Sequence, residues 1–221
     1  MAIKLAFSHP WDVSIAEAKR IQLELAQRVI LEDDIKAVSH VAGVDVGFED
    51  KGRITRAAIA VLTFPELELA DSSLARTQTT FPYVPGYLSF RELPAVLKAL
   101  ETLRIIPDLF LCDGQGIAHP RRFGIACHLG VLTDIPSIGV GKSRLTGHYE
   151  EPGQEKGCYS ILTDKGEEIG VVLRNRDSTK PLFISPGHRV SQAGAMAWVL
   201  KCTTRYRLPE TTRHAHRLAS G

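Results

Sequence analysis

The residue best placed for chemistry is Asp113, which directly follows four apolar residues, 109–112, and precedes Gly114. This pattern predicts the carboxyl end of a buried strand that runs into a tight turn. In open α/β sheets, ligands and catalytic groups collect at that edge. A carboxylate there can hold a metal ion or transfer protons, and an aspartate that only caps the turn is the alternative.

A second acid, Asp45, stands inside an expected strand over residues 41–48. Side chains alternate across a strand, so apolar residues at even positions would face the core while Gly43, Asp45 and Gly47 share the other face. Glycine in a strand often marks the close approach of a ligand or of another backbone. We therefore expect cleared space on both sides of this carboxylate, with a hydrogen-bonded edge aspartate as the alternative.

Two more charged residues come from separate segments. Glu92 ends Ser89-Phe90-Arg91-Glu92, a capping-box pattern that would open a helix, and closing that box is its simplest role. Lys142 follows an expected strand over residues 136–140 and could reach a phosphate, although a solvated loop lysine is commoner. The spacing of a P-loop is absent. The three acids together offer the oxygen ligands that a hard divalent cation takes.

The segment 81–87, Phe-Pro-Tyr-Val-Pro-Gly-Tyr, is predicted to form a rigid loop that carries two tyrosines. Such a loop can stack on bases or wedge between them, and simple hydrophobic anchoring is the alternative. Residues 201–217 are rich in lysine, arginine and histidine, with Glu210 as their one acid. A face that contacts phosphates is expected there, unless these residues form only a solvated basic tail.

Composition adds few constraints. The 221 residues are 44% hydrophobic with a net charge of +2, which suits one domain over residues 1–221 and permits nucleic-acid binding without requiring it. The cysteines lack zinc-site spacing, which favours a reducing compartment. The sequence has neither an 18-residue apolar run nor a secretory leader pattern. We therefore expect a cytoplasmic monomer with no membrane span.

The order of expected elements predicts the fold class. Three consecutive strands are most simply antiparallel, and later strands that alternate with helices are most simply parallel. This order indicates an α/β fold, with a ribonuclease H-like mixed β-sheet flanked by helices. The expected helices are 14–31, 89–103, 122–132, 189–202 and 209–218, and the expected strands are 41–48, 54–64, 67–80, a strand ending at Asp113, 136–140, 158–162 and 169–173.

Six stretches of the chain, taken in order, carry a resemblance to a known family: GVDVGF (43–48), FPYVPGYLSFRE (81–92), CDGQGIAHPRR (112–122), IGVGKSRL (138–145), PLFISPGHRV (181–190) and YRLPETTR (206–213). With them the chain resembles, over nearly its whole length, the endonuclease V family, the deoxyinosine 3′-endonucleases. The resemblance implies a ribonuclease H-like fold and a nuclease that depends on Mg²⁺, with Mn²⁺ expected to substitute. Its partner would be inosine-containing DNA, or RNA, cut at the second phosphodiester bond 3′ to the inosine to leave a 3′-hydroxyl and a 5′-phosphate.

The resemblance also implies roles for single residues. Asp45, Glu92, Asp113 and Lys142 would be catalytic, and the three acids would bind metal. His216 would be a further metal ligand, with His214 as its competitor, and Thr211 stands where the family usually has proline. Residues 82–85 would form a strand-separating wedge with Tyr83 at its tip. The implied nucleic-acid contacts are Pro82, Tyr83, Val84, Pro85, Gly86, Gly114, Gly116 and His119.

Three other functions stay open at this point. A glycosylase with lyase activity could use Lys142 as a Schiff-base nucleophile and would need no metal. A binding module could mark inosine without cutting, although a set of carboxylates would repel phosphate. A nuclease directed at RNA or at branched structures could use the same fold.

Overall fold

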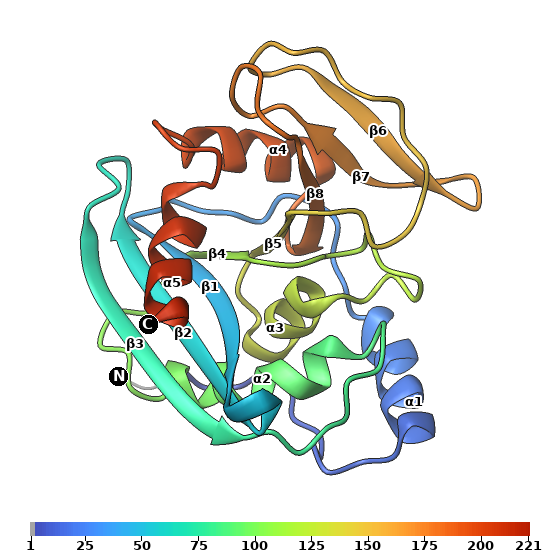
Figure 1. The fold of residues 1–221 in the computed structure, drawn as a ribbon, viewed down its shortest axis with the longest axis vertical. Coiled ribbons are helices and arrows are strands. Elements are labelled where there is room, and N and C mark those ends of the chain that lie inside the picture. The colour runs from blue at the N-terminus through green and yellow to red at the C-terminus, as the bar shows by residue number, and fades with distance from the viewer. Residues whose placement is uncertain (1–2) are drawn as a thin grey trace.

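The structure, a computed structural model, describes residues 3–221. Within that range all eight strands form one sheet in the order β3-β2-β1-β4-β5-β8-β7-β6, and five α-helices cover it (Figure 1). The strands are β1 (His40–Glu49), β2 (Ile54–Thr63), β3 (Leu69–Gln78), β4 (Leu109–Cys112), β5 (Ser137–Gly141), β6 (Tyr159–Asp164), β7 (Glu167–Leu173) and β8 (Leu182–His188). The helices are α1 (Ile15–Ala26), α2 (Leu88–Leu100), α3 (Ile125–Thr133), α4 (Gln192–Lys201) and α5 (Glu210–Ser220), with a short 3₁₀ turn, η1 (Asp50–Gly52).

The sheet is mixed, as predicted. β1, β2 and β3 are antiparallel, while β4 runs parallel to both β1 and β5. The sequence did not reveal β8, which pairs antiparallel with β5 and joins the β6–β7 hairpin to the sheet. Pro186 and Gly187 hid this strand, because both residues are unusual inside a central strand, and its pairing with β5 shifts register beside them.

Helices cover both faces of the sheet and bury two cores. On one face α1, α2 and α3 pack with residues such as Phe90, Phe110 and Leu129. On the other face α4 packs over residues such as Val41 and Ile138, and α5 lies along β1 and β2. The predicted α/β class with helices flanking the sheet is confirmed. No helix among residues 3–221 is both long and apolar enough to cross a membrane.

The expected capping box at the start of α2 is wrong. The helix begins at Leu88 after Tyr87, so Ser89 lies inside its first turn, where its hydroxyl hydrogen-bonds to Nδ1 of His128 at 3.0 Å. Glu92 therefore has no capping role. Other helix ends also shift: α1 stops at Ala26 rather than residue 31, and α3 begins only at Ile125, after the left-handed backbone of a preceding arginine.

The glycines beside Asp45 make room for a helix rather than for a ligand. A Cβ atom at Gly43 would lie 1.9 Å from the carbonyl oxygen of Thr211, and one at Gly47 would lie 2.9 Å from that of Ala219. The backbone of α5 therefore fills the space that we expected to be clear. The opposite face of β1 is buried only in part, because Phe48 is 40% exposed.

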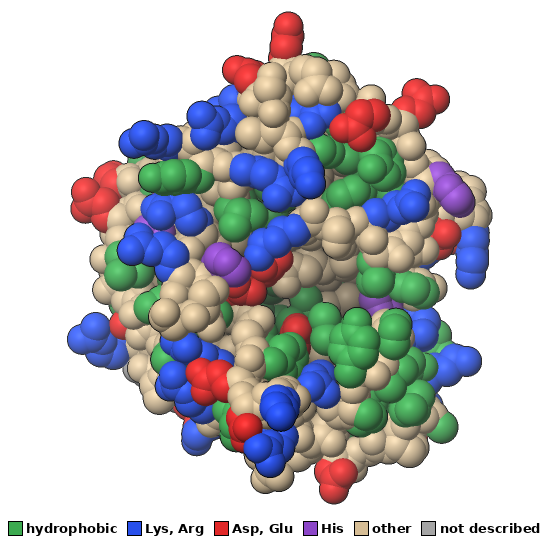
Figure 2. Space-filling model, in the orientation of Figure 1, with side chains coloured by type: hydrophobic (Ala, Val, Ile, Leu, Met, Phe, Trp, Pro, Cys, Tyr) green, Lys and Arg blue, Asp and Glu red, His purple; other side chains and the backbone are tan. Residues whose placement is uncertain are grey.

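Charged and apolar side chains surround a hollow on one face of the molecule. Figure 2 shows lysines and arginines around this hollow, with acidic and histidine side chains near its centre. An apolar patch borders the hollow on the side where Figure 1 places α1 and α2.

Candidate active site

The parallel pairing of β1 with β4 brings Asp45 and Asp113 together. Val44 lies beside Cys112 in the register, so the two aspartates are the next residues on adjacent strands. The Asp113 amide donates a hydrogen bond to the carbonyl oxygen of Val44 at 2.8 Å, which extends the ladder to the acid itself. Backbone pairing, rather than a mobile loop, therefore sets the separation of the two carboxylates.

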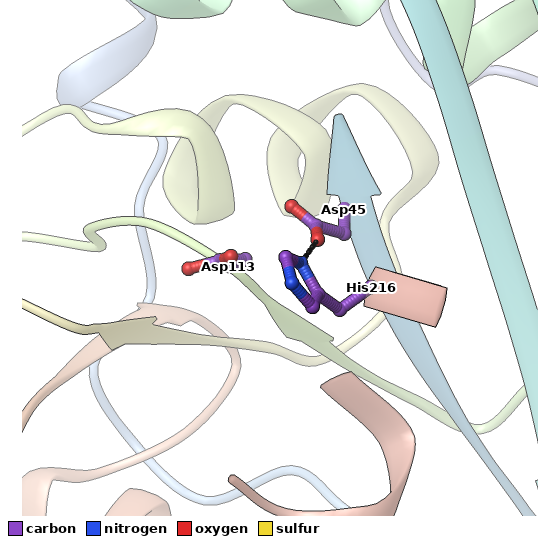
Figure 3. Close-up of side chains that lie close together, drawn as sticks. All are labelled: Asp45, Asp113 and His216. Atoms are coloured by element: carbon purple, nitrogen blue, oxygen red, sulfur yellow. Dashed lines mark hydrogen bonds and ion pairs between the residues drawn. The ribbon is translucent and has the colours of Figure 1, made fainter. Parts of the chain in front are cut away.

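Helix α5 adds an imidazole to this pair (Figure 3). Nδ1 of His216 lies 2.6 Å from Oδ2 of Asp45, and ligand atoms of Asp45, Asp113 and His216 all lie within 4.8 Å of one another. The competing His214 instead lies beside Arg213, with its Nε2 3.9 Å from a carboxylate oxygen of Glu210. Of the two histidines, His216 is the one that joins the aspartates.

Glu92 completes a crowded acidic group from the side of α2. Burial, and then the charges of Asp45 and Asp113, raise its pKa well above the ordinary value. Burial and the charge of Asp45 likewise raise the pKa of Asp113 to about 6, against the opposing effect of Lys142. Excess negative charge among oxygen ligands, with an imidazole at hand, is a donor set that suits a divalent cation such as Mg²⁺ or Mn²⁺.

Lys142 reaches the acids from the end of β5. Its ammonium forms an ion pair with Asp113. Two side chains hold its loop: Gln115, to which we gave no role, donates to the carbonyl oxygen of Ser143 at 3.0 Å. Arg207, expected only as part of the basic stretch 201–217, donates to the carbonyl oxygen of Lys142 at 3.3 Å. Both lie inside the matched stretches, but their types alone do not indicate a role.

A cavity of about 380 Å³ opens on one side of the acidic group. Its lining includes Glu92 and Asp113, and Tyr83, which lies at its rim, is 72% exposed. Of the residues expected to contact nucleic acid, Tyr83, Val84, Pro85, Gly86, Gly114 and His119 line the cavity, and Pro82 and Gly116 do not.

Gly116 and His119 make contacts within the protein. A Cβ atom at Gly116 would lie 1.9 Å from the carbonyl oxygen of Pro186, so this glycine permits close packing against β8. Nδ1 of His119 accepts a hydrogen bond from the Arg121 amide at 3.2 Å, and its Nε2 donates to the carbonyl oxygen of Gly86 at 3.0 Å. Burial lowers the pKa of His119 to about 4, so its ring is neutral.

A second hollow, of about 420 Å³, lies on the other side of the acids. Asp45, His216, Glu49 and Arg56 line it, and it shares Asp113 and Lys142 with the first cavity. The two spaces therefore meet at the ion pair of these shared residues. A chain-like ligand could run from one hollow to the other past the acids.

Comparison with known proteins agrees with this geometry. Residues 23–217 match the family model described as Endonuclease V. The chain belongs to the Endonuclease V family. Among curated proteins, the Endonuclease V of Rippkaea orientalis is 60% identical over 220 residues, which span 100% of this chain and 95% of that protein. The resemblance seen in the motifs is thereby confirmed.

Solved structures of the family have the same fold. The Endonuclease V of Streptomyces avermitilis is 45% identical, with a TM-score of 0.90, and the match covers 95% of this chain and 93% of that one. The Endonuclease V of Ciona intestinalis, solved in complex with a 24mer DNA containing an inosine followed by a ribo-adenosine, is 30% identical. Its TM-score is 0.77, with 93% of this chain and 95% of that one covered.

Proposed function

We propose that this protein is a Mg²⁺-dependent endonuclease that recognises deoxyinosine in DNA. It hydrolyses the second phosphodiester bond on the 3′ side of the lesion and leaves a 3′-hydroxyl and a 5′-phosphate. The observation that carries the proposal is the group Asp45, Asp113 and His216 beside a cavity with an exposed tyrosine at its rim. The inosine-containing DNA bound by the Ciona relative supports the choice of substrate.

In this proposal Asp45, Asp113, Glu92 and His216 hold the metal. A divalent cation bound there supplies Lewis-acid activation of the phosphate and lowers the pKa of a coordinated water. Lys142 lies at the junction of the two hollows, where its ammonium can offset charge that develops on the scissile phosphate. The ion pair with Asp113 and the hydrogen bonds on its loop hold it in place before substrate binds.

Recognition in this proposal uses the apolar cavity. A volume of about 380 Å³ is large enough for one extruded base. Extrusion costs a few kcal/mol, and less for a mismatched base. Tyr83 would fill the gap left in the duplex. Hypoxanthine lacks the 2-amino group of guanine, so a close wall at that position would exclude guanine by steric contact and by leaving its amino group unpaired.

Cleavage of inosine-containing RNA is the second candidate, and the ribo-adenosine that follows the inosine in the Ciona complex favours it. The glycosylase alternative is weaker. A Schiff base needs a free amine, and the Lys142 side chain is paired with a carboxylate. A binding module without catalysis does not account for three crowded acids at the junction of two hollows.

Cleavage of end-labelled strands tests the proposal directly. DNA and RNA of one sequence, each with a single inosine or a matched adenine, are incubated with Mg²⁺, Mn²⁺ or EDTA. We expect one cut at the second bond 3′ to inosine, with either metal and not with EDTA. Release of free hypoxanthine without metal, or equal cutting of the adenine strand, would overturn the proposal. The ratio of DNA to RNA cleavage decides between the two substrates.

Two further parts of the proposal concern the protein as a whole. We propose that residues 1–221 act as one domain and as a monomer in the cytoplasm. Light scattering during size exclusion would give the mass of one chain, 24.3 kDa. A mass of two chains would overturn the monomer without affecting the proposed chemistry.

A further inference from the structure

The carbonyl oxygen of Gly86 accepts hydrogen bonds from three side chains. Gln22 Nε2 donates at 3.0 Å, His119 Nε2 at 3.0 Å and Arg121 Nη2 at 2.5 Å. A backbone carbonyl oxygen has two lone pairs, so three donors use all of its hydrogen-bonding capacity. Gly86 is the last residue but one of the loop 81–87 that carries Tyr83, and its φ of +81° is a left-handed conformation that favours glycine. We call Gln22, His119 and Arg121 the Gly86 clamp.

Gln22 links the clamp to the N-terminal helix. It is 1% exposed on α1, and both ends of its amide are used, because Oε1 accepts from Nε of Arg121 at 2.6 Å. This second bond fixes which end of the amide faces Gly86. Gln22 therefore ties the loop to α1, across 64 residues of sequence.

Arg121 has no acidic partner among the described residues 3–221. Its guanidinium instead meets the Gly86 carbonyl and the Gln22 amide oxygen, and it lies over the ring of Tyr87 at 4.1 Å. The two hydrogen bonds and the stacking on Tyr87 fix the orientation of the planar guanidinium, and the ammonium of a lysine could not make all three contacts. Arg121 is thus directed at the loop rather than at a salt bridge.

The other end of the loop is held in a similar way. Arg91 donates to the carbonyl oxygens of Phe81 and Gly52 at 3.1 Å each, and its guanidinium lies over the ring of Phe48. Between the two ends, the Tyr87 amide donates to the carbonyl oxygen of Val84 at 3.0 Å, while Tyr83 is 72% exposed. The direction of Tyr83 is therefore set at the two ends of the loop.

We infer that Gln22 and Arg121 are positioning residues, which hold the loop 81–87 through the Gly86 carbonyl so that Tyr83 can enter a duplex. This inference rests on the proposed function, because it assigns the loop to strand separation. Neither residue reaches the acids: they act on cleavage only through the loop. Loss of the clamp should therefore affect duplex substrates more than single strands, in which no neighbouring base pair must be opened.

The most informative variant is Gln22→Glu. The carboxylate keeps an acceptor for Arg121, so the helix stays tied to the guanidinium, but it cannot donate to Gly86 and repels that carbonyl. Gln22→Leu removes both bonds. The control is Gln192→Glu, which makes the same change at a partly buried amide on α4 that donates to the Ile184 carbonyl instead of to the loop.

Two measurements test the clamp. For Gln22→Glu we expect the ratio of kcat/KM on inosine duplex to kcat/KM on inosine single strand to fall about tenfold. Hydrogen exchange at the Tyr87 amide should become faster in Gln22→Glu and Gln22→Leu and stay unchanged in the control. An unchanged ratio together with unchanged exchange would overturn the inference, and so would equal losses on both substrates with a lowered melting temperature.

Failure of the clamp differs from failure of the proposed function. If the wild-type protein shows no preference for inosine, the function proposed above is wrong, and the exchange rate at Tyr87 still tests the clamp. If the wild-type protein prefers inosine and Gln22→Glu behaves like the control in both measurements, only the clamp is wrong.

Discussion

The two hollows that meet at Asp113 are built in different ways. The acidic side is set by strand register and by a helix packed directly onto glycines of β1, so its geometry follows from the backbone. The apolar side is bordered by a loop whose ends are fixed by a few side-chain donors on two carbonyl oxygens. The proposed chemistry thus lies on rigid elements, and the proposed recognition lies on a loop that single substitutions can loosen.

The largest effect should come from the acidic side. Asp45→Asn or Asp113→Asn keeps the shape of the side chain but removes a charged ligand from the metal group. We expect the single-turnover cleavage rate to fall by roughly 10³-fold or more, while affinity for inosine DNA stays measurable by fluorescence anisotropy. Asp108→Asn, at a carboxylate outside the site that accepts from the backbone amides of Ser39 and His40, is the matched control for both variants. Normal cutting by Asp113→Asn in Mg²⁺ would remove the metal assignment.

The next effect should come from the loop. Tyr83→Ala removes the exposed ring that would fill the gap in the duplex. Because stacking on an aromatic ring contributes about 1–3 kcal/mol per base, affinity for inosine duplex should fall about 10- to 100-fold, with a smaller loss on single strands. Tyr83→Phe keeps the ring and should stay near the wild type. Equal losses on duplex and single strand would contradict a role of Tyr83 in strand separation.

On the acidic side, the sequence predicted where the two aspartates lie but not what packs beside them. Each aspartate was recognisable from its place on an apolar strand, and the ordered motifs supplied the family. The sequence could not show which part of the protein packs beside Asp45, because a glycine indicates a missing side chain but not the group that takes its place. The backbone of α5 occupies that space.

Long-range side-chain contacts explain the other misses. The capping box failed because the Ser89 hydroxyl has a second possible partner, His128, which only the packing of α3 against α2 supplies. The Gly86 clamp depends on Gln22, a glutamine with no distinguishing feature in its helix except that folding places its amide beside the Gly86 carbonyl. Local patterns carry no information about such a contact.

A smaller effect concerns stability without metal. Glu92 has a raised pKa, so above pH 4.5 the folded protein holds a carboxylate whose ionisation is unfavourable there. Glu92→Gln should raise the unfolding free energy in EDTA by about 1 kcal/mol, with little gain near pH 4.5 and more at about pH 7.5. Thermal unfolding at the two pH values measures this. Asp113 has a pKa of about 6 in the folded protein, so the free energy of unfolding of the wild-type protein should also fall as the pH rises from 3.8 to about 6.

The effect of Mg²⁺ on stability tests the same acidic group in the opposite direction. Mg²⁺ should raise the melting temperature of the wild-type protein more than that of Glu92→Gln, because the cation offsets the repulsion that the variant has already removed. Glu101→Gln, at an exposed carboxylate just after α2, is the control and should change neither value. A wild-type protein whose stability is independent of Mg²⁺ would contradict this account of the acids.

The smallest effect should come from Thr211, in the first turn of the helix that carries His216. Its hydroxyl is buried without a hydrogen-bond partner, whereas the hydroxyl of its neighbour Thr212 donates to the Pro209 carbonyl at 3.2 Å. Thr211→Val should therefore stabilise the protein by about 0.5–1 kcal/mol, and Thr212→Val should destabilise it by about 1 kcal/mol. Urea unfolding measures both. Because α5 packs on the acidic side only, neither change should alter the ratio of duplex to single-strand cleavage, and a changed ratio would mean that the two sides are coupled.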